Sequence, residues 1–317
     1  MNLTDNRSLY VIAGATASGK TAVAVELAKK INGEVISADS MQIYRGMDIG
    51  TAKPTLAEMS GIPHHMLDIV DPHEPFSAAE FQRLAIAAIE EIRMRGRIPI
   101  LAGGTGFYIN AVLYGTEFSS ESNAKEDELR EKFAIMAREK GAEELHKKLA
   151  QADPAYAATI HANNVKRVAR ALAYCEVSGG LFSEYNAAQK AKKSNQPLYD
   201  ANFFVLSMRR EILYERINSR VISMFEAGFV EEVRSLLSNG YNKNLASMQA
   251  IGYKEIAQFI NDEITHDETI TAIQQATRHY AKRQETWFRN QTPDAIVLNA
   301  EGKTSEELAG EIIDRRF

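Results

Sequence analysis

Residues 9–21 of the chain read LYVIAGATASGKT, and this stretch decides the fold. Its first half is a short apolar run that ends in glycine, a pattern typical of a buried strand. Its second half, Gly14 to Thr21, satisfies the pattern GxxxxGKS/T, and the residues that follow repeat apolar side chains every four positions, as a helix does. A strand, a glycine-rich turn and a helix in this order predict a phosphate-binding loop. We expect the helix to stop at Gly33.

The chemistry of such a loop follows from its backbone. Glycines let the N–H groups of the turn point inward, and the N-terminus of the helix adds partial positive charge. Lys20 supplies a full positive charge, and the hydroxyl of Thr21 is placed to hold Mg²⁺. The candidate phosphate-binding residues are Gly14, Thr16, Ala17, Ser18, Gly19, Lys20 and Thr21.

Strands and helices alternate along the first third of the chain. Further strands are predicted in EVISADS (34–40), HHMLDIV (64–70) and RIPILAGG (97–104). A helix that starts at Ser77 has Glu80 in the capping-box position, and another helix begins in TGFYINAVLYG (105–115). The alternation predicts an α/β fold with a parallel sheet flanked by helices.

From about residue 116 the pattern changes to charged helices without strand-like runs. Strand character returns in NFFVLSMR (202–209) and, after long helices, in AIVLNA (295–300), whereas residues 187–197 read as a polar connector. We therefore predict two domains. They are a phosphate-loop catalytic domain of residues 1–115 and 200–317, and an all-helical insertion domain of residues 116–199.

Composition restricts the class of protein. With 45% hydrophobic and 25% charged residues the chain is typical of globular proteins, and no run of 18 apolar residues predicts a membrane span. The single cysteine, Cys175, excludes an internal disulfide and a zinc site with two cysteines. The N-terminus does not read as a secretory signal, so we expect a cytoplasmic protein and, by default, a monomer. A net charge of −5 disfavours nucleic acid unless basic residues gather locally.

Polar residues follow two further strands of the predicted sheet. In open parallel sheets ligands bind beyond the carboxyl ends of the strands, where Asp39 and Thr105 are expected. The strand before Thr105 ends in glycines, although an NTPase needs an acidic residue there to anchor Mg²⁺. A phosphate loop, a carboxylate and a hydroxyl in one cleft favour a group-transfer enzyme. Aspartate also forms turns, so the position of Asp39 alone leaves a structural role open.

Six blocks of the sequence are together more specific than the loop. They are GATASGKT (14–21), SADSMQIYRGMDIGTAKP (37–54), HHMLDI (64–69), PFSAAEFQR (75–83), PILAGGTGFYINAVLYG (99–115) and KRQETWFR (282–289). In this order, and along nearly the whole chain, they resemble the bacterial tRNA dimethylallyltransferases, also called tRNA isopentenyltransferases.

The resemblance implies transfer of a dimethylallyl group from dimethylallyl diphosphate to N6 of adenosine 37, next to the anticodon, in tRNAs that read codons beginning with U. In that family the loop binds the diphosphate of the donor instead of ATP. Asp39 matches the general base, and Thr105 matches a threonine that contacts the substrate. Lys20 and Mg²⁺ then stabilise the departing diphosphate. The adenine has to leave the anticodon-loop stack, as in base flipping.

The resemblance also implies contacts with tRNA. The candidates are Asp39, Ser40, Met41, Gln42, Thr105, Arg130, Lys166, Arg167, Arg170, Lys282, Arg283 and Arg289. On the helix predicted around the KRQETWFR block, Arg278, Lys282 and Arg289 share one face, and Trp287 lies on the opposite side, where core packing is expected. The role of a third basic cluster, Lys190, Lys192 and Lys193, stays open. Arg216 and Arg220 are placed to approach the diphosphate.

One residue departs from the family's pattern, and three others are expected to have structural roles. The family usually has proline where Ala15 stands. Eukaryotic relatives carry a Cys/His zinc finger, for which this sequence lacks the cysteines, so the resemblance implies a bacterial or organellar type. His64 and His65 are adjacent on a predicted strand and point to opposite faces, which favours structural roles over metal binding. Cys175 is expected to be a small core residue.

Two other functions stay open. A small-molecule or nucleoside kinase would use the loop for ATP and transfer a phosphoryl group. A non-catalytic RNA-binding adaptor with a vestigial loop would bind RNA without needing Asp39.

Overall fold

The structure, a computed structural model, describes residues 8–116, 118, 124–192 and 197–315. Contacts divide the chain into a sheet unit, Met1–Gly115 with Pro197–Phe317, and a helical unit, Thr116–Gln196. The predicted boundary, which assigns residues 197–199 to the insertion, is wrong. They belong with the sheet because the Leu198 amide donates to the carbonyl of Leu113 at 2.7 Å and Tyr199 is buried in the core of the sheet unit.

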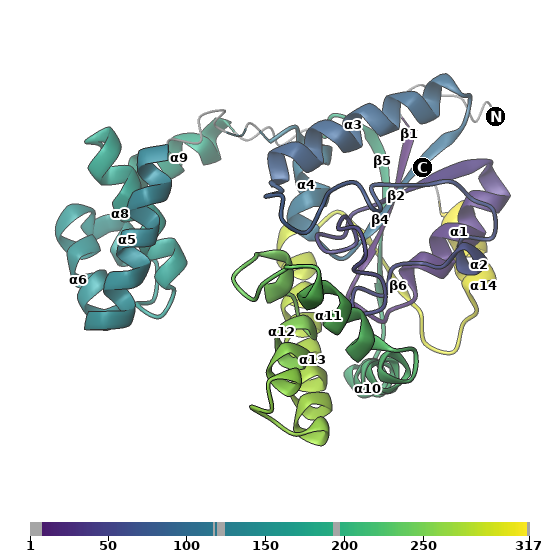
Figure 1. The fold of residues 1–317 in the computed structure, drawn as a ribbon. Coiled ribbons are helices and arrows are strands. Elements are labelled where there is room, and N and C mark those ends of the chain that lie inside the picture. Colours follow the sequence, from purple (N-terminus) through teal and green to yellow (C-terminus); the bar gives the residue numbers. More distant parts are fainter. Residues whose placement is uncertain (1–7, 117, 119–123, 193–196, 316–317) are drawn as a thin grey trace. The chain divides into compact units, whose positions relative to one another are not determined.

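The sheet unit is built on six parallel strands in the order β3-β2-β4-β1-β5-β6 (Figure 1). The strands are β1 (Ser8–Gly14), β2 (Gly33–Ser37), β3 (His64–His65), β4 (Ile98–Gly103), β5 (Asp200–Ser207) and β6 (Ile296–Asn299). The predicted α/β fold with a parallel sheet is confirmed. The second and third strands are shorter than their apolar runs, because the chain leaves the sheet after Ser37 and after His65.

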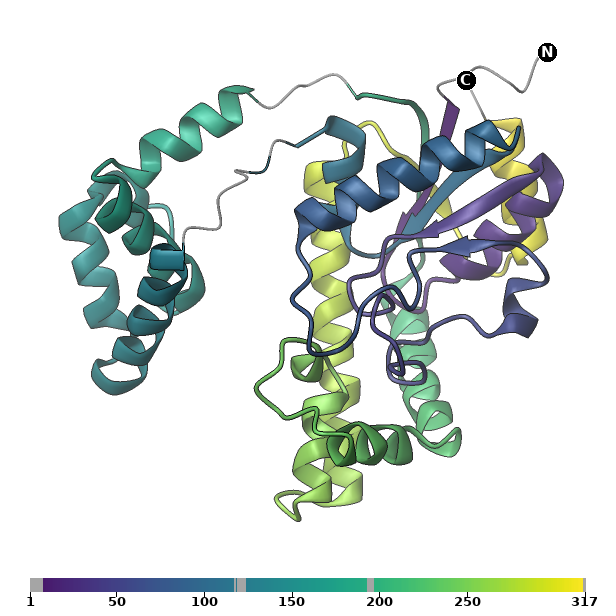
Figure 2. The same ribbon diagram turned by 45° about the horizontal axis from the view of Figure 1, so that its top comes forward.

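Helices cover both faces of the sheet. On one face α1 (Lys20–Ile31) and α14 (Ser305–Asp314) lie side by side, as both views show (Figures 1 and 2). On the other face lie α3 (Ala78–Met94) and α4 (Gly106–Tyr114). Alternating side chains of β1 supply the two cores: Tyr10 and Ile12 point to one, and Leu9 and Val11 point to the other.

A third core lies under the segment that follows β2. The remaining helices of the sheet unit are α2 (Leu56–Met59), α10 (Arg210–Glu226), α11 (Phe229–Ser238), the short 3₁₀ helix η1 (Ser247–Gln249), α12 (Tyr253–Ile260) and α13 (His266–Gln291). Ile43, Tyr44 and Met47 are buried against α10, α11, α12 and α13. This core therefore fixes the chain between β2 and β3 onto the C-terminal helices.

Two helix ends were predicted from local sequence, the start at Ser77 and the stop at Gly33, and only the first is confirmed. The Ser77 hydroxyl accepts a hydrogen bond from the Glu80 amide, and the Glu80 carboxylate accepts one from the Ser77 amide, so the predicted capping box is confirmed. The expected stop at Gly33 is wrong. Asn32 takes the left-handed conformation with φ of 55°, and Gly33 begins β2. A Cβ on Gly33 would lie 2.9 Å from the Ile100 side chain, so this glycine serves close strand packing.

The helical unit packs around its own core. Its helices are α5 (Ala124–Lys140), α6 (Ala142–Ala152), α7 (Pro154–Ala157), α8 (Val165–Ser178) and α9 (Phe182–Lys192), coloured teal in Figures 1 and 2. Leu145, Leu149 and Val168 are fully buried at its centre, and Cys175 packs partly buried against them, as expected of a core cysteine. The predicted connector at 187–197 is wrong in its first half, because α9 continues to Lys192.

Within the part of the chain that the structure describes, no helix is long and apolar enough to cross a membrane. The two adjacent histidines have separate structural partners. His65 Nε2 lies 2.6 Å from Glu34 Oε2, and His64 Nδ1 lies 2.9 Å from the carbonyl oxygen of Ile62. Among the described residues no group of three or more His, Cys, Asp or Glu side chains could hold a metal ion.

At the end of β4, Gly103 is a position where a larger side chain should destabilise the fold. A Cβ on Gly103 would lie 2.2 Å from the backbone oxygen of Ala38, which cannot move aside without distorting the segment after β2. We expect Gly103→Ala to lower the free energy of unfolding by about 1–3 kcal/mol, the usual cost of overpacking.

Urea denaturation followed by circular dichroism measures this effect, and Gly310→Ala is the matched control. Gly310 lies within α14 with no atom near its missing side chain, so alanine there should leave stability unchanged or raise it by up to about 1 kcal/mol. Equal stability of Gly103→Ala and the native protein would contradict this packing.

Candidate active site

Three loops meet at the carboxyl end of the sheet. They follow β1 (Gly14–Thr21), β2 (Ala38–Gln42) and β4 (Gly104–Thr105). The loops after β2 and β4 are joined directly, because the Thr105 amide donates to the Ala38 carbonyl at 3.1 Å and the Ser40 amide donates to Thr105 Oγ1 at 3.2 Å. The absence of a side chain at Gly103 permits this approach.

Gln284 of α13 joins the loops after β1 and β4. Its Oε1 accepts a hydrogen bond from the Thr16 amide at 2.8 Å, and its Nε2 donates to the Gly104 carbonyl at 2.9 Å. The side chain is buried, and a Cβ on Gly104 would lie 2.2 Å from Nε2. The sequence did not single out this residue, although it lies within the KRQETWFR block. We expected the Thr16 amide to donate to phosphate, but it donates to Gln284 instead.

The loop after β1 has the backbone of a phosphate-binding turn. Ala17 and Gly19 adopt positive φ angles of 64° and 95°, which turns the chain sharply into the N-terminus of α1. Lys20 folds back, and its Nζ donates to the Ala15 carbonyl at 2.6 Å. The hydroxyl of Ser18 is buried and has no hydrogen-bond partner among the described residues, an arrangement that suits a ligand with oxygen atoms.

The Lys20 ammonium lies in an unfavourable field. Burial, followed by repulsion from Arg220, lowers the pKa of Lys20 from 10.5 to about 7, while Asp39 opposes the shift. Burial also lowers the pKa of Arg220, and Arg216 adds to that shift. A Cβ on Gly19 would lie 3.9 Å from a guanidinium nitrogen of Arg216. The structure thus gathers Lys20, Arg216 and Arg220 of the sheet unit at one loop.

Asp39 faces this cluster from the end of β2. Its Oδ1 accepts hydrogen bonds from the amides of Met41 at 2.9 Å and Gln42 at 3.4 Å, which closes a tight turn. Burial raises the pKa of Asp39 above its usual value, although these amides and the charge of Lys20 oppose the shift. The side chain therefore forms the turn that its residue type allows and also presents a carboxylate with enhanced basicity next to Lys20.

Thr105 also has a neighbour on α13. Tyr280 lies near Thr105 and Gln284, and its hydroxyl interacts electrostatically with both. Burial, followed by the charge of Asp39, raises the pKa of Tyr280, so the phenol keeps its proton. Tyr280 was not predicted from the sequence either. Trp287, further along α13, packs against Gly106 at the start of α4, which agrees with its expected place on the core side of the helix.

The donor set fits Mg²⁺ only in part. Thr21 is exposed at the second position of α1, and the Asp39 carboxylate lies near the neighbouring Lys20. Because Mg²⁺ keeps several waters and takes ligands from substrate phosphates, one protein hydroxyl beside a bound diphosphate satisfies its chemistry. The expected Mg²⁺ at Thr21 stays a prediction.

The basic residues expected to contact tRNA lie in both units. In the sheet unit Lys282, Arg283 and Arg289 are exposed on α13. In the helical unit Lys166, Arg167 and Arg170 are exposed on α8, and Arg130 on α5 is paired with Glu126 and Asp127. Arg278 donates to Asn218 Oδ1 at 2.7 Å and is partly buried. Of the third cluster, Lys193 and the side chains of Lys190 and Lys192 lie outside the described residues.

Comparison with known proteins gives the family. The family model described as IPP transferase matches residues 42–291. The chain belongs to the IPP transferase family. A tRNA dimethylallyltransferase of Caldanaerobacter subterraneus subsp. tengcongensis is 47% identical over 307 residues, which cover 96% of each chain.

Two solved structures extend the comparison. A tRNA isopentenylpyrophosphate transferase of Staphylococcus epidermidis is 42% identical, with a TM-score of 0.69 over 98% of each chain. A eukaryotic dimethylallyltransferase acting on tRNA is 29% identical, with a TM-score of 0.78 over 98% of this chain and 80% of that one. The resemblance seen in the sequence blocks is confirmed.

The bridge made by Gln284 leads to a stability prediction. In Gln284→Leu the partly buried Thr16 amide and the Gly104 carbonyl lose their partners, and we expect the free energy of unfolding to fall by about 1–3 kcal/mol. Gln275→Leu, at an exposed position of the same helix, should change it by less than about 0.5 kcal/mol. Urea denaturation measures both, and equal effects of the two substitutions would show that Gln284 does not join the loops.

Proposed function

We propose that this IPP transferase moves the dimethylallyl group of dimethylallyl diphosphate to N6 of adenosine 37, next to the anticodon, in tRNAs that read codons beginning with U. The observation that carries the proposal is the placement of Lys20 and Asp39, whose charges act on each other's pKa across the ends of β1 and β2. A cation for a leaving diphosphate and a base for an amine then face one substrate cleft.

Asp39 is proposed as the general base. The exocyclic amine of adenine is a weak nucleophile, because its lone pair is delocalised into the ring. Its nitrogen forms a bond with C1 of the allyl group while the C1–O bond to diphosphate breaks, and the N6 proton passes to the Asp39 carboxylate. The pKa raised by burial makes this carboxylate a stronger base than an exposed aspartate. Thr105 would contact the same substrate through its hydroxyl.

The loop after β1 is proposed to hold the leaving group. Negative charge on the diphosphate grows as the C1–O bond breaks, so cations and N–H groups that are already in place favour the transition state. Lys20, Arg216 and Arg220 supply the cations, and the N-terminus of α1 supplies the amides. Mg²⁺ held by Thr21 and the diphosphate would neutralise further charge.

The tRNA is proposed to contact both units. Ser40, Met41 and Gln42 lie beside Asp39, where the flipped adenine would enter. Exposed cations on α13 and α8 would neutralise phosphates of the anticodon arm, and Arg130 would have to exchange its carboxylate partners for RNA. We infer a monomer that works in the cytoplasm, where its tRNA substrate is found.

The experiment that tests the proposal incubates the protein with Mg²⁺, tRNA lacking the modification, dimethylallyl diphosphate labelled in the allyl group, and ATP labelled in its γ-phosphate. The allyl label should appear in RNA together with free diphosphate, and the ATP label should not be transferred. Phosphoryl transfer, or no transfer of either label, would refute the proposed function.

The same assay tests Asp39. Asp39→Asn keeps an oxygen that accepts the Met41 and Gln42 amides, so the turn should persist while the base is lost. We expect turnover to fall by at least about 100-fold, the typical lower bound for a general base, with donor affinity preserved. A variant with native turnover would remove Asp39 from this role.

The lowered pKa of Lys20 predicts a pH dependence of donor binding. Below about pH 7 the free protein carries the ammonium, and above it each binding event has to take up a proton. We expect the ratio of the dissociation constants of Lys20→Ala and the native protein to fall with rising pH above 7, by up to about tenfold per unit. Calorimetric titration with inorganic diphosphate measures it, since the ligand's own titration cancels in the ratio. A constant ratio from about pH 6 to 9 would mean an ordinary lysine.

A further inference from the structure

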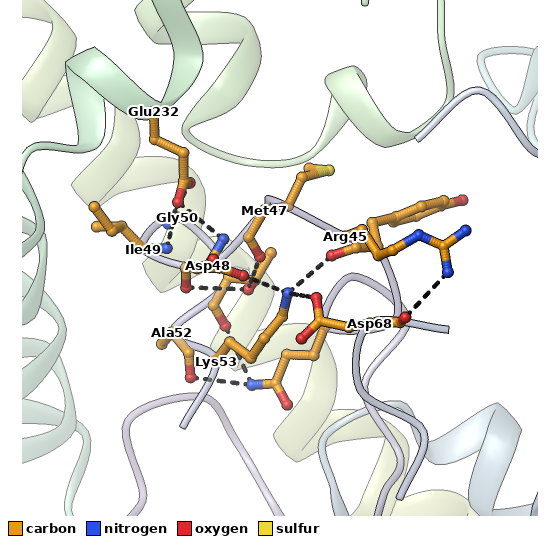
Figure 3. Close-up of polar contacts among 12 residues, drawn as sticks. Arg45, Met47, Asp48, Ile49, Gly50, Ala52, Lys53, Asp68 and Glu232 are labelled. Atoms are coloured by element: carbon orange, nitrogen blue, oxygen red, sulfur yellow. Dashed lines mark hydrogen bonds and ion pairs between the residues drawn. The ribbon is translucent and has the colours of Figure 1, made fainter. Parts of the chain in front are cut away.

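Glu232 on α11 makes an unusual set of contacts with the segment between β2 and β3. Its carboxylate accepts hydrogen bonds from three consecutive backbone amides: Asp48 at 2.9 Å, Ile49 at 2.7 Å and Gly50 at 3.1 Å (Figure 3). The hydroxyl of Tyr253 donates a fourth, at 2.6 Å. Successive N–H groups that point at one anion form a concave site of the kind that proteins use to bind phosphate. In this protein the chain's own carboxylate fills it.

The surrounding side chains leave little freedom for this contact. Phe229 and Tyr253 meet edge to face with ring centroids 5.1 Å apart. A Cβ on Gly50 would lie 2.2 Å from the Phe229 ring, so the backbone can reach Glu232 only because residue 50 is a glycine. Burial, followed by the Glu232 charge, raises the pKa of Tyr253, which therefore remains a donor.

A second anchor holds the opposite side of the same segment. The Lys53 side chain is almost fully buried, and its Nζ contacts the carboxylates of Asp48 and Asp68 at 2.5 Å each and the Tyr44 carbonyl at 2.8 Å (Figure 3). Lys53 thus ties the segment to the chain that follows β3. Glu232 adds hydrogen bonds to the C-terminal helices, next to the buried apolar contacts of the same segment.

Hydrogen bonds, joined by short pieces of backbone, link Glu232 to the candidate base. Next to the three amides, the carbonyls of Thr51 and Ala52 accept from Gln42 Nε2 at 3.3 and 3.1 Å. Gln42 Oε1 accepts from the Ser37 hydroxyl at 2.9 Å. The Gln42 amide in turn donates to Asp39, so the position of residues 48–52 sets that of Gln42 and of the turn that holds the carboxylate.

We propose that Glu232 is a positioning residue for the transfer reaction: by clamping the amides of residues 48–50 it fixes Gln42 and, through it, the Asp39 turn. This inference rests on the proposed function. Glu232 touches neither the loop after β1 nor the cations beside it, so its loss should leave donor binding intact. Misplacement of a reacting group by about 1 Å can cost up to about 100-fold in rate. The change at Asp39 is transmitted through a chain of hydrogen bonds that can partly adjust, so about tenfold is expected.

The test compares Glu232→Gln with Glu231→Gln in the full chain. The first substitution replaces one carboxylate oxygen with an NH₂ group, which would face N–H donors. Glu231 is the matched control, because it precedes Glu232 on α11, is exposed, and forms its ion pair with Arg234 at 3.4 Å, on its own helix. Tyr253→Phe removes one of the four donors and keeps the ring. It tests the same contact if Glu232→Gln does not fold. Turnover, the KM for each substrate and amide hydrogen exchange are measured.

Three results support the inference. Turnover of Glu232→Gln falls about tenfold with the KM for dimethylallyl diphosphate unchanged within about twofold, and exchange of the amides at residues 41, 42 and 48–50 accelerates. Tyr253→Phe shows the same pattern at about two- to threefold. Glu231→Gln behaves as the native protein.

Other outcomes overturn it. Native turnover in Glu232→Gln, or a parallel loss of donor affinity and turnover, would show that the clamp only stabilises the fold or does nothing for the reaction. Absence of transfer by the native protein would instead reject the proposed function, and the two failures are therefore distinguishable.

Discussion

The repulsion among three cations at one loop is the constraint on which the site depends. Lys20, Arg216 and Arg220 gather where α1 begins, and burial lowers the pKa of Lys20 and of Arg220. The Asp39 carboxylate offsets only part of the shift in the pKa of Lys20. An incoming diphosphate, as we propose, would bring the missing negative charge. In the proposed function, the free protein is thus prepared for the anion that it would bind and then release.

The same arrangement explains how a loop common in nucleotide-binding proteins can serve another chemistry. β4 ends in Gly103 and Gly104 follows it, where a carboxylate would be needed to anchor Mg²⁺ for phosphoryl transfer. Glycine permits the close approach of Ala38, which brings Asp39 next to Thr105. A nucleotide hydrolase would use this position for a metal ligand, whereas this chain uses it for backbone contact between two loops.

The sheet and the meeting of three loops at its carboxyl edge could be predicted from the sequence. The apolar runs are local signals, and parallel strands must end at one edge, so the meeting of the Gly14–Thr21 loop, Asp39 and Thr105 followed from the alternation of strands and helices. Gln284, Tyr280 and Glu232 could not be found in this way. Each joins segments far apart in the chain, Gln284 to Thr16 across 268 positions, and a single polar residue on a helix carries no signal of its partner. The stop at Asn32 was missed because asparagine took the left-handed role that glycine usually fills.

We propose, as the centre of this account, that the loop after β1 holds the diphosphate of a donor whose allyl carbon C1 faces Asp39. The most direct measurement is a crystal structure with Mg²⁺ and an unreactive donor in which sulfur replaces the oxygen between C1 and phosphorus. We predict diphosphate oxygens within hydrogen-bonding distance of Lys20 Nζ and the amides at the start of α1, with C1 directed toward Asp39. A diphosphate bound away from this loop, or an allyl group directed away from Asp39, would contradict it.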